Sequence, residues 1–211
     1  MIRGLIADDH AVVRKGMVQI LSALDILSEL VLDEAQNGAE TLAALQSAPY
    51  DFVLLDIALP DMNGLEVLKL LRHQFPSMPV LMLSIYSEKQ YAIRSLQAGA
   101  AGYLTKESAP EELLTAVRQA LAGGRYISQA VVETMTEGLL RGSAEVTHES
   151  LSDREYQVLS LLGQGKSISQ IADYLSLSVK TVSTYRARIL TKLELTTTAE
   201  LIGYAVRHNL S

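Results

Sequence analysis

Five polar residues of this 211-residue sequence follow short apolar segments, and their side chains suit phosphoryl chemistry. They are Asp8, Asp9, Asp56, Ser84 and Lys106. Three clustered carboxylates repel one another unless a cation neutralises them, and oxygen ligands of this charge favour Mg²⁺ or a similar hard ion. A lysine ammonium binds phosphate as a point charge, and a serine hydroxyl adds a hydrogen-bond donor. If the fold brings these groups together, they could transfer a phosphoryl group to a carboxylate.

The segments that would position these residues alternate between strand and helix patterns. Apolar runs at residues 2–7, 30–35, 52–56, 80–84 and 101–105 predict strands. Helical patterns follow at about 10–24, 37–47, 63–75, 86–98 and 109–122. The third and fourth runs do not alternate between apolar and polar residues, as expected for strands buried on both faces. We therefore predict an α/β fold, a (βα)5 doubly wound parallel sheet with helices on both faces.

Ligands of an open parallel sheet bind beyond the carboxyl ends of its strands, near the point where the strand order reverses. In the order 2-1-3-4-5 the first and third strands are neighbours at that point. Asp8, Asp9 and Asp56 would then meet at one edge of the sheet, with Ser84 and Lys106 beside them.

These residues, together with Pro60, Gly64 and Tyr103, resemble the receiver domain of two-component response regulators over residues 1–122. The resemblance implies that a sensor histidine kinase phosphorylates Asp56 and that Lys106 binds the phosphoryl group. It also implies that Ser84 and Tyr103 form a switch pair, and that Mg²⁺ is held by Asp8, Asp9, Asp56 and the carbonyl of Ala58. Many receivers carry a cis-bonded proline after the lysine, whereas Glu107 stands here. Because a cis bond before a non-proline residue costs about 3–4 kcal/mol, we do not expect that geometry.

The last 60 or so residues show no strand pattern and four short helical segments. Three segments open with a hydroxyl residue followed three positions later by Glu or Gln, which fits the capping box. These pairs are Ser152 with Glu155, Ser167 with Gln170 and Thr197 with Glu200, and the fourth segment opens at Ser178. We predict a small all-α domain over residues 149–211. A linker over 123–148 would precede it, with a helical stretch at about 128–141 and an aperiodic segment at 142–150.

Residues 168–187 read as a helix-turn-helix unit. An apolar seam is expected from Ile171, Leu175, Leu177 and Val182, and a stripe on the second helix from Val179, Val182, Ile189, Leu190 and Leu193. The opposite face carries hydroxyls, a tyrosine edge and cations, which suit a DNA major groove and its phosphates. Arg186 falls within the apolar stripe, so we expect its stem to pack and its head to reach solvent.

Residues 151–206 resemble the LuxR-type four-helix output domain of the NarL/FixJ class. The resemblance rests on residues 151–159, Gly165, Ser178, Thr181, Val182, Lys192 and Leu193. It implies a homodimer that forms on phosphorylation and binds double-stranded promoter DNA at paired half-sites. The expected DNA contacts are Lys180, Thr181, Ser183, Thr184, Tyr185, Arg188 and Lys192. Ser183 and Tyr185 stand where lysine and histidine are commonest, which weakens phosphate attraction.

Composition excludes several classes. The chain has no cysteine and four scattered histidines, so thiolate chemistry is excluded and a histidine-rich metal site is not expected. No apolar run approaches about 18 residues and no secretory signal opens the chain, which predicts a cytoplasmic protein without a membrane partner. Residues 1–148 carry a net charge of −7 and residues 149–211 a net charge of +1, in keeping with two units that have different partners.

Two other functions remain open at this stage. A Mg²⁺-dependent phosphatase acting through an aspartyl phosphate usually needs a second acid two residues after its nucleophile, where Ala58 stands. A receiver-like protein controlled by a ligand without phosphorylation usually lacks residues of the acidic cluster. The favoured interpretation is a phosphorylation-switched transcription regulator and not an enzyme. Its kinase, its operator and the direction of regulation are left open.

Overall fold

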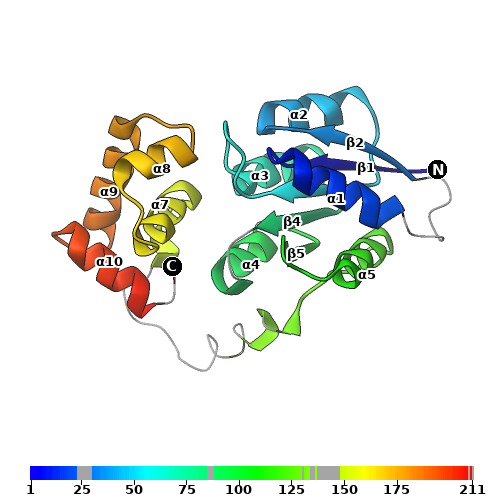
Figure 1. The fold of residues 1–211 in the computed structure, drawn as a ribbon. Helices are drawn as coiled ribbons and strands as arrows, with labels where there is room; N and C mark the ends of the chain where they lie inside the picture. Colours follow the sequence, from blue (N-terminus) through cyan, green and yellow to red (C-terminus); the bar gives the residue numbers. More distant parts are fainter. Residues whose placement is uncertain are drawn as a thin grey trace. The chain divides into compact units, whose positions relative to one another are not determined.

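Five parallel strands form the sheet in the computed structural model, in the order β2-β1-β3-β4-β5 (Figure 1). They are β1 (Ile2–Ala7), β2 (Leu30–Ala35), β3 (Phe52–Asp56), β4 (Val80–Ser84) and β5 (Gly102–Thr105). The helices that follow them are α1 (Ala11–Ser22), α2 (Gly38–Ser47), α3 (Gly64–Gln74), α4 (Glu88–Gln97) and α5 (Pro110–Leu121). The predicted (βα)5 fold is confirmed, and the strand order is the one in which β1 and β3 are neighbours.

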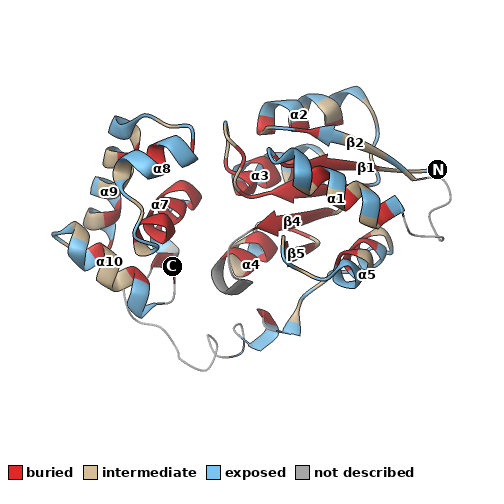
Figure 2. Cartoon of the chain, viewed as in Figure 1, coloured by how far each residue is buried: buried red, intermediate tan, exposed pale blue. Residues whose placement is uncertain are grey.

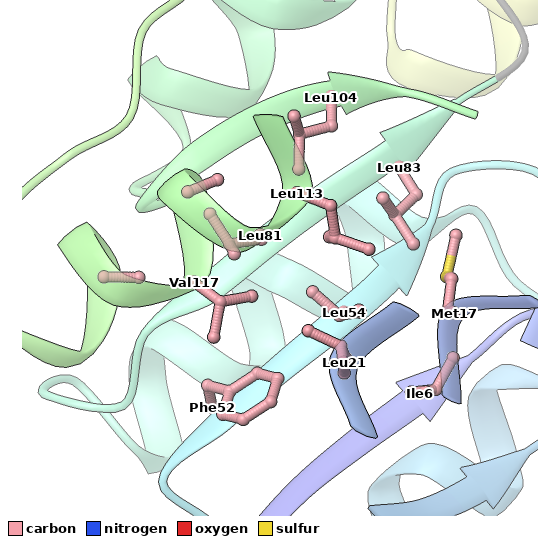
Figure 3. Packing of buried hydrophobic residues seen from close by; sticks show 12 residues of the cluster. Ile6, Met17, Leu21, Phe52, Leu54, Leu81, Leu83, Leu104, Leu113 and Val117 are labelled. Carbon is pink, nitrogen blue, oxygen red and sulfur yellow. The ribbon is translucent and has the colours of Figure 1, made fainter. Parts of the chain in front are cut away.

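Helices cover both faces of the sheet. Helices α1 and α5 lie on one face, where Met17, Leu21, Leu113 and Val117 pack against strand residues (Figure 3). Those strand residues are Ile6, Phe52, Leu54, Leu81, Leu83 and Leu104. Helices α2, α3 and α4 lie on the other face (Figure 1). Because both faces are covered, every residue of β3 and β4 is buried (Figure 2). This explains why these two runs do not alternate in polarity.

The chain divides into two compact units, Met1–Arg141 and Gly142–Ser211. The structure describes residues 1–22, 30–84, 88–129, 131–133, 136, 148–208 and 210. A helix is predicted at 128–141. Residues 129, 131–133 and 136 of this stretch are helical, and residue 128 is not. The remaining residues of the stretch lie outside the described residues. Most of the predicted aperiodic segment at 142–150 also lies outside them. No helix in the described ranges is long and apolar enough to cross a membrane.

The second unit contains the four predicted helices after a short 3₁₀ helix (His148–Ser150). They are α7 (Asp153–Gly163), α8 (Ile168–Tyr174), α9 (Val179–Lys192) and α10 (Thr198–Arg207). Ser152, Ser167 and Thr197 each form the predicted capping box, and Ser178 caps α9 alone. These local signals fix the helix starts because each cap satisfies backbone N–H groups that lack a partner within the helix.

The apolar stripe of α9 is shorter than predicted. Val182 and Ile189 are fully buried, whereas Val179 is 50% exposed. Val179 is the first residue of the helix, and the buried stripe begins at Val182, one turn later. Arg186 is half-buried and donates from Nη1 to Thr198 Oγ1 of α10 at 3.0 Å. Its head therefore binds a neighbouring helix and does not simply reach into solvent.

Gly64 is required where α3 begins, because β3 and α3 approach closely there. A Cβ atom at this position would lie 2.0 Å from the Asp56 carbonyl oxygen and 2.8 Å from Ile57 Cα. Both are backbone atoms, so neither can move without displacing the end of β3. By contrast, a Cβ atom at Gly16, inside α1, meets nothing within 4 Å.

We expect Gly64→Ala to lower the thermal unfolding temperature sharply, because it forces the backbone around Asp56 apart. Gly16→Ala is the matched control, and it should stabilise α1 by about 0.5–1 kcal/mol since alanine is the better helix former. Differential scanning calorimetry of both variants tests this pair. Equal unfolding temperatures for the two variants would show that the approach at Gly64 is not tight.

Candidate functional site

The alternation of side chains along the strands brings three charged residues to one edge of the sheet. Successive residues of a strand point to opposite faces. The apolar cluster between the sheet and helices α1 and α5 is called the α1/α5 core below. Asp8, Asp56 and Lys106 each lie two residues after one of its members, which are Ile6, Leu54 and Leu104. The three charged side chains therefore continue that face at the carboxyl ends of β1, β3 and β5.

Lys106 forms ion pairs with both buried carboxylates. Its Nζ lies 2.7 Å from Asp8 Oδ2 and 2.7 Å from Asp56 Oδ2. The side chains of Asp8, Asp56 and Lys106 are 0%, 1% and 7% exposed. The second oxygen of Asp56 accepts a hydrogen bond from the backbone N–H of Ala58 at 3.1 Å. The ammonium thus offsets the repulsion between two carboxylates that water cannot screen.

The charge states of this pair follow from its burial. The pKa of Asp56 is raised to about 6, because burial outweighs the lowering by the Lys106 ammonium and the Asp8 carboxylate adds to the rise. Burial lowers the pKa of Lys106, but the attraction of Asp56 and the hydrogen bonds of both carboxylates outweigh it and leave the pKa raised. Lys106 is therefore charged at neutral pH, and Asp56 is a carboxylate there with unusually little solvation.

Asp9 and His10 complete the cluster on its exposed side. Ligand atoms of Asp8, Asp9, His10 and Asp56 all lie within 4.8 Å of one another. Three carboxylates in so small a space fit a hard divalent cation, and this acidic pocket is typical of the Mg²⁺ site of receiver domains. Sequence reasoning missed His10, although its position directly after Asp8 and Asp9 was the available signal.

The loop between β3 and α3 is fixed to the start of α2. Asp61 accepts hydrogen bonds from the backbone N–H groups of Gly38 at 2.7 Å and Ala39 at 2.9 Å. Burial raises the pKa of Asp61, but these backbone donors outweigh it and leave the pKa lowered. Two residues further along the loop, Asn63 caps α3 in a capping box. The loop that follows Asp56 is therefore anchored to both α2 and α3 at the end nearer α3.

Ser84 and Tyr103 lie on the opposite face of the sheet from the α1/α5 core. Tyr103 pairs with Met82, two residues before Ser84, so the three side chains share a face. Both members of the predicted switch pair are buried, and the Tyr103 ring already lies inside the protein. The Ser84 carbonyl accepts a hydrogen bond from the Lys106 N–H at 2.7 Å.

The residues predicted to contact DNA lie along α9 and differ in their exposure and in their side-chain partners. Lys180, Thr184, Arg188 and Lys192 are exposed, and Thr181, Ser183 and Tyr185 are half-buried. Lys192 is engaged, because its Nζ lies 2.6 Å from Glu155 Oε2 of α7. Burial raises the pKa of Glu155, but Lys192 and Ser152 hold it below the usual value. Lys180 and Arg188 form no side-chain bond with the described residues.

Replacing Lys106 by methionine should leave two buried carboxylates facing each other without a cation. We expect Lys106→Met to lose about 3–5 kcal/mol of unfolding free energy at pH 8 in the presence of a chelator. Urea unfolding measures this loss. The control is Lys15→Met on the exposed side of α1, which should stay within about 0.5 kcal/mol of the parent protein. A similar result for both variants would contradict the role of the ammonium.

Two family matches cover most of the chain. Residues 5–118 match the response regulator receiver domain, and residues 149–205 match the bacterial regulatory proteins of the luxR family. The response regulator GacA of Pseudomonas protegens is 38% identical over 211 residues, covering 100% of this chain and 98% of the relative. The response regulator UvrY of Escherichia coli K12 is 35% identical, covering 100% of this chain and 96% of the relative.

A solved structure with the same fold is that of RcsB from Salmonella enterica serovar Typhimurium, bound to the promoter rprA with the phosphomimetic BeF₃⁻. It matches with a TM-score of 0.63 and 24% identity, covering 97% of this chain and 98% of that one. The matched families comprise transcription regulators and not enzymes, which sets the phosphatase alternative aside. The acidic cluster, the helix-turn-helix unit and these matches agree, and the chain belongs to the NarL/FixJ family of phosphorylation-controlled response regulators, with a receiver domain and a LuxR-type DNA-binding domain.

Proposed function

We propose that a sensor histidine kinase phosphorylates Asp56, and that phosphorylation drives dimerisation and promoter binding. The observation that carries this proposal is the ammonium of Lys106 held 2.7 Å from an oxygen of Asp56 and from an oxygen of Asp8. A buried carboxylate beside a fixed cation is suited to receive a phosphoryl group, since the cation stabilises the added negative charge.

In the transfer step, a carboxylate oxygen of Asp56 attacks the phosphorus atom of a phosphohistidine on the kinase. The P–N bond breaks, and its electron pair leaves with the imidazole nitrogen. Lys106 then pairs with an oxygen of the new phosphoryl group. The Mg²⁺ ion would be held by Asp8, Asp9, Asp56 and the Ala58 carbonyl. When bound, it neutralises the clustered charge and offers open positions to phosphoryl oxygens.

The switch would start at Ser84, whose hydroxyl bonds to a phosphoryl oxygen. Phosphorylation adds about −1.5 to −2 charges, and moving a population from 1:99 to 99:1 needs about 5.5 kcal/mol. A few charge-assisted hydrogen bonds of about 1.5–3 kcal/mol each are sufficient. The Tyr103 ring is buried before phosphorylation, so the switch would not need to turn it inward. Phosphorylation would stabilise this inward position, and the surface of α4, β5 and α5 would favour a second copy.

DNA recognition is assigned to α9. Lys180 and Arg188 would contact phosphates, and Thr181, Ser183, Thr184 and Tyr185 would face base edges or the sugar-phosphate backbone. The proposed contact of Lys192 would have to compete with its bond to Glu155. One helix-turn-helix unit buries about 600–1,000 Å² against DNA, which rarely gives specific affinity alone. Two copies on half-sites about one helical turn apart would supply it, in the cytoplasm where promoter DNA is found.

Incubation with acetyl phosphate and Mg²⁺ should add the mass of one phosphoryl group and increase the affinity for promoter DNA. Asp56→Asn should gain neither. Asp51→Asn is the matched control, because Asp51 is an exposed carboxylate next to the start of the same strand. Intact-protein mass spectrometry and selection of bound DNA fragments, with and without the phosphodonor, measure both effects.

Two outcomes would contradict this assignment. If Asp56→Asn still gains the phosphoryl mass, another residue is the acceptor. If the protein is phosphorylated at Asp56 but its DNA binding does not change, control by a ligand or a partner becomes the better interpretation.

Ser84→Ala should accept the phosphoryl group at Asp56 but fail to dimerise or gain DNA affinity, because the variant lacks the proposed donor. Ser84→Thr keeps the hydroxyl and should restore the response. Sedimentation velocity and DNA titration of the phosphorylated proteins give the readout. Should phosphorylated Ser84→Ala dimerise and bind DNA like the parent protein, the switch does not run through this hydroxyl.

A further inference from the structure

An imidazole lies against the acidic cluster and has no role in the function proposed above. His10 Nδ1 is 2.6 Å from Asp9 Oδ1 and 3.3 Å from Asp8 Oδ1. These are the carboxylates that receive a divalent cation in the proposed function. The His10 side chain is 56% exposed, so water and ions reach it from solvent. Any ion drawn to these two oxygens meets the nitrogen as well.

The backbone holds this imidazole in place. The His10 N–H donates to Asp8 Oδ1 at 2.8 Å, and the His10 carbonyl accepts from the Arg14 N–H in the first turn of α1. Arg14 also donates from Nη1 to the Asp8 carbonyl at 2.7 Å. Its Nε binds Glu34 at 2.6 Å, which ties the arginine to β2. The segment from Asp8 to His10 is therefore fixed before any ion binds.

Nitrogen and oxygen ligands select different cations. Carboxylate and carbonyl oxygens suit Mg²⁺, whereas imidazole favours first-row transition ions, with affinity rising from Mn²⁺ through Co²⁺ to Ni²⁺. The neutral ring coordinates through one nitrogen and keeps its proton on the other. Nδ1 is the nitrogen that faces Asp8 and Asp9, and at 2.6 Å from Asp9 Oδ1 it donates its proton to that carboxylate. A bound cation would take the place of this proton at Nδ1, and the ring would keep a proton on Nε2.

We propose that His10 is an additional metal ligand, and that it gives the acidic cluster a preference for first-row transition ions such as Mn²⁺ and Ni²⁺ over Mg²⁺. This inference rests on the proposed function in so far as it assumes that Asp8 and Asp9 bind a divalent cation. It concerns the identity of that cation and not the phosphorylation of Asp56.

Isothermal titration of the full chain with MgCl₂ and, separately, with NiCl₂ tests the proposal. We expect His10→Gln to weaken Ni²⁺ binding by about 10-fold or more, the scale on which single ligand-sphere groups act, and to leave Mg²⁺ binding within about threefold. His73→Gln, which removes an exposed histidine on α3, controls for surface binding of Ni²⁺ and should change neither affinity. Asp9→Asn should weaken binding of both ions.

Pulsed electron paramagnetic resonance of bound Mn²⁺ gives a readout that a positioning role would not produce. Nitrogen modulation from an imidazole should be present in the parent protein and absent in His10→Gln. If Mg²⁺ and Ni²⁺ affinities fall together in that variant, or if the nitrogen modulation persists, His10 is not a ligand. Ni²⁺ binding through His10 without Mg²⁺ binding would support this inference and contradict the proposed Mg²⁺. Binding of neither ion would overturn both.

Discussion

The receiver unit depends on one ammonium placed between two carboxylates that are withdrawn from water. Lys106 comes from the end of β5, whereas Asp56 ends β3, and β4 lies between them. Neighbouring strands are about 4.7–4.9 Å apart, so the cation must cross about two strand spacings. Only a long side chain can do so. The bond from the Lys106 N–H to the Ser84 carbonyl fixes the backbone from which it starts.

This arrangement makes the site sensitive to added charge. The ammonium compensates Asp8 and Asp56 together, so a phosphoryl group on Asp56 or a divalent ion beside Asp8 must change how its contacts are shared. Ser84 and Tyr103 point to the face opposite the α1/α5 core. A structural change that starts at Asp56 and reaches Tyr103 would therefore involve the carboxyl end of β4. It would not require the apolar core between α1 and α5 to repack.

Patterns that are local or repeated along the chain predicted most of this structure. Given the strand order, the meeting of Asp8, Asp56 and Lys106 followed from parallel-sheet geometry, and capping boxes marked the helix starts. The missed features depend on tertiary contacts. Asp61 reaches across to α2, and Lys192 binds Glu155 from a distant helix. Periodicity gives the phase of α9 but not where its neighbours end, so the exposure of Val179 was not foreseen.

The charge distribution along the chain supports the proposed control by dimerisation. Residues 1–148 are acidic, and the side of α9 that is proposed to contact DNA offers few unpaired cations because Lys192 is paired with Glu155. With these proposed contacts a single copy would have little electrostatic attraction for DNA, since that attraction grows with the number of phosphates neutralised. Phosphorylation makes the receiver more negative, and at physiological salt such a charge acts over only about 8 Å. If the added negative charge acted directly on α9, it would weaken the attraction of that helix for DNA phosphates. Joining two weakly binding units doubles their contacts with DNA, and this gain is independent of the sign of the added charge.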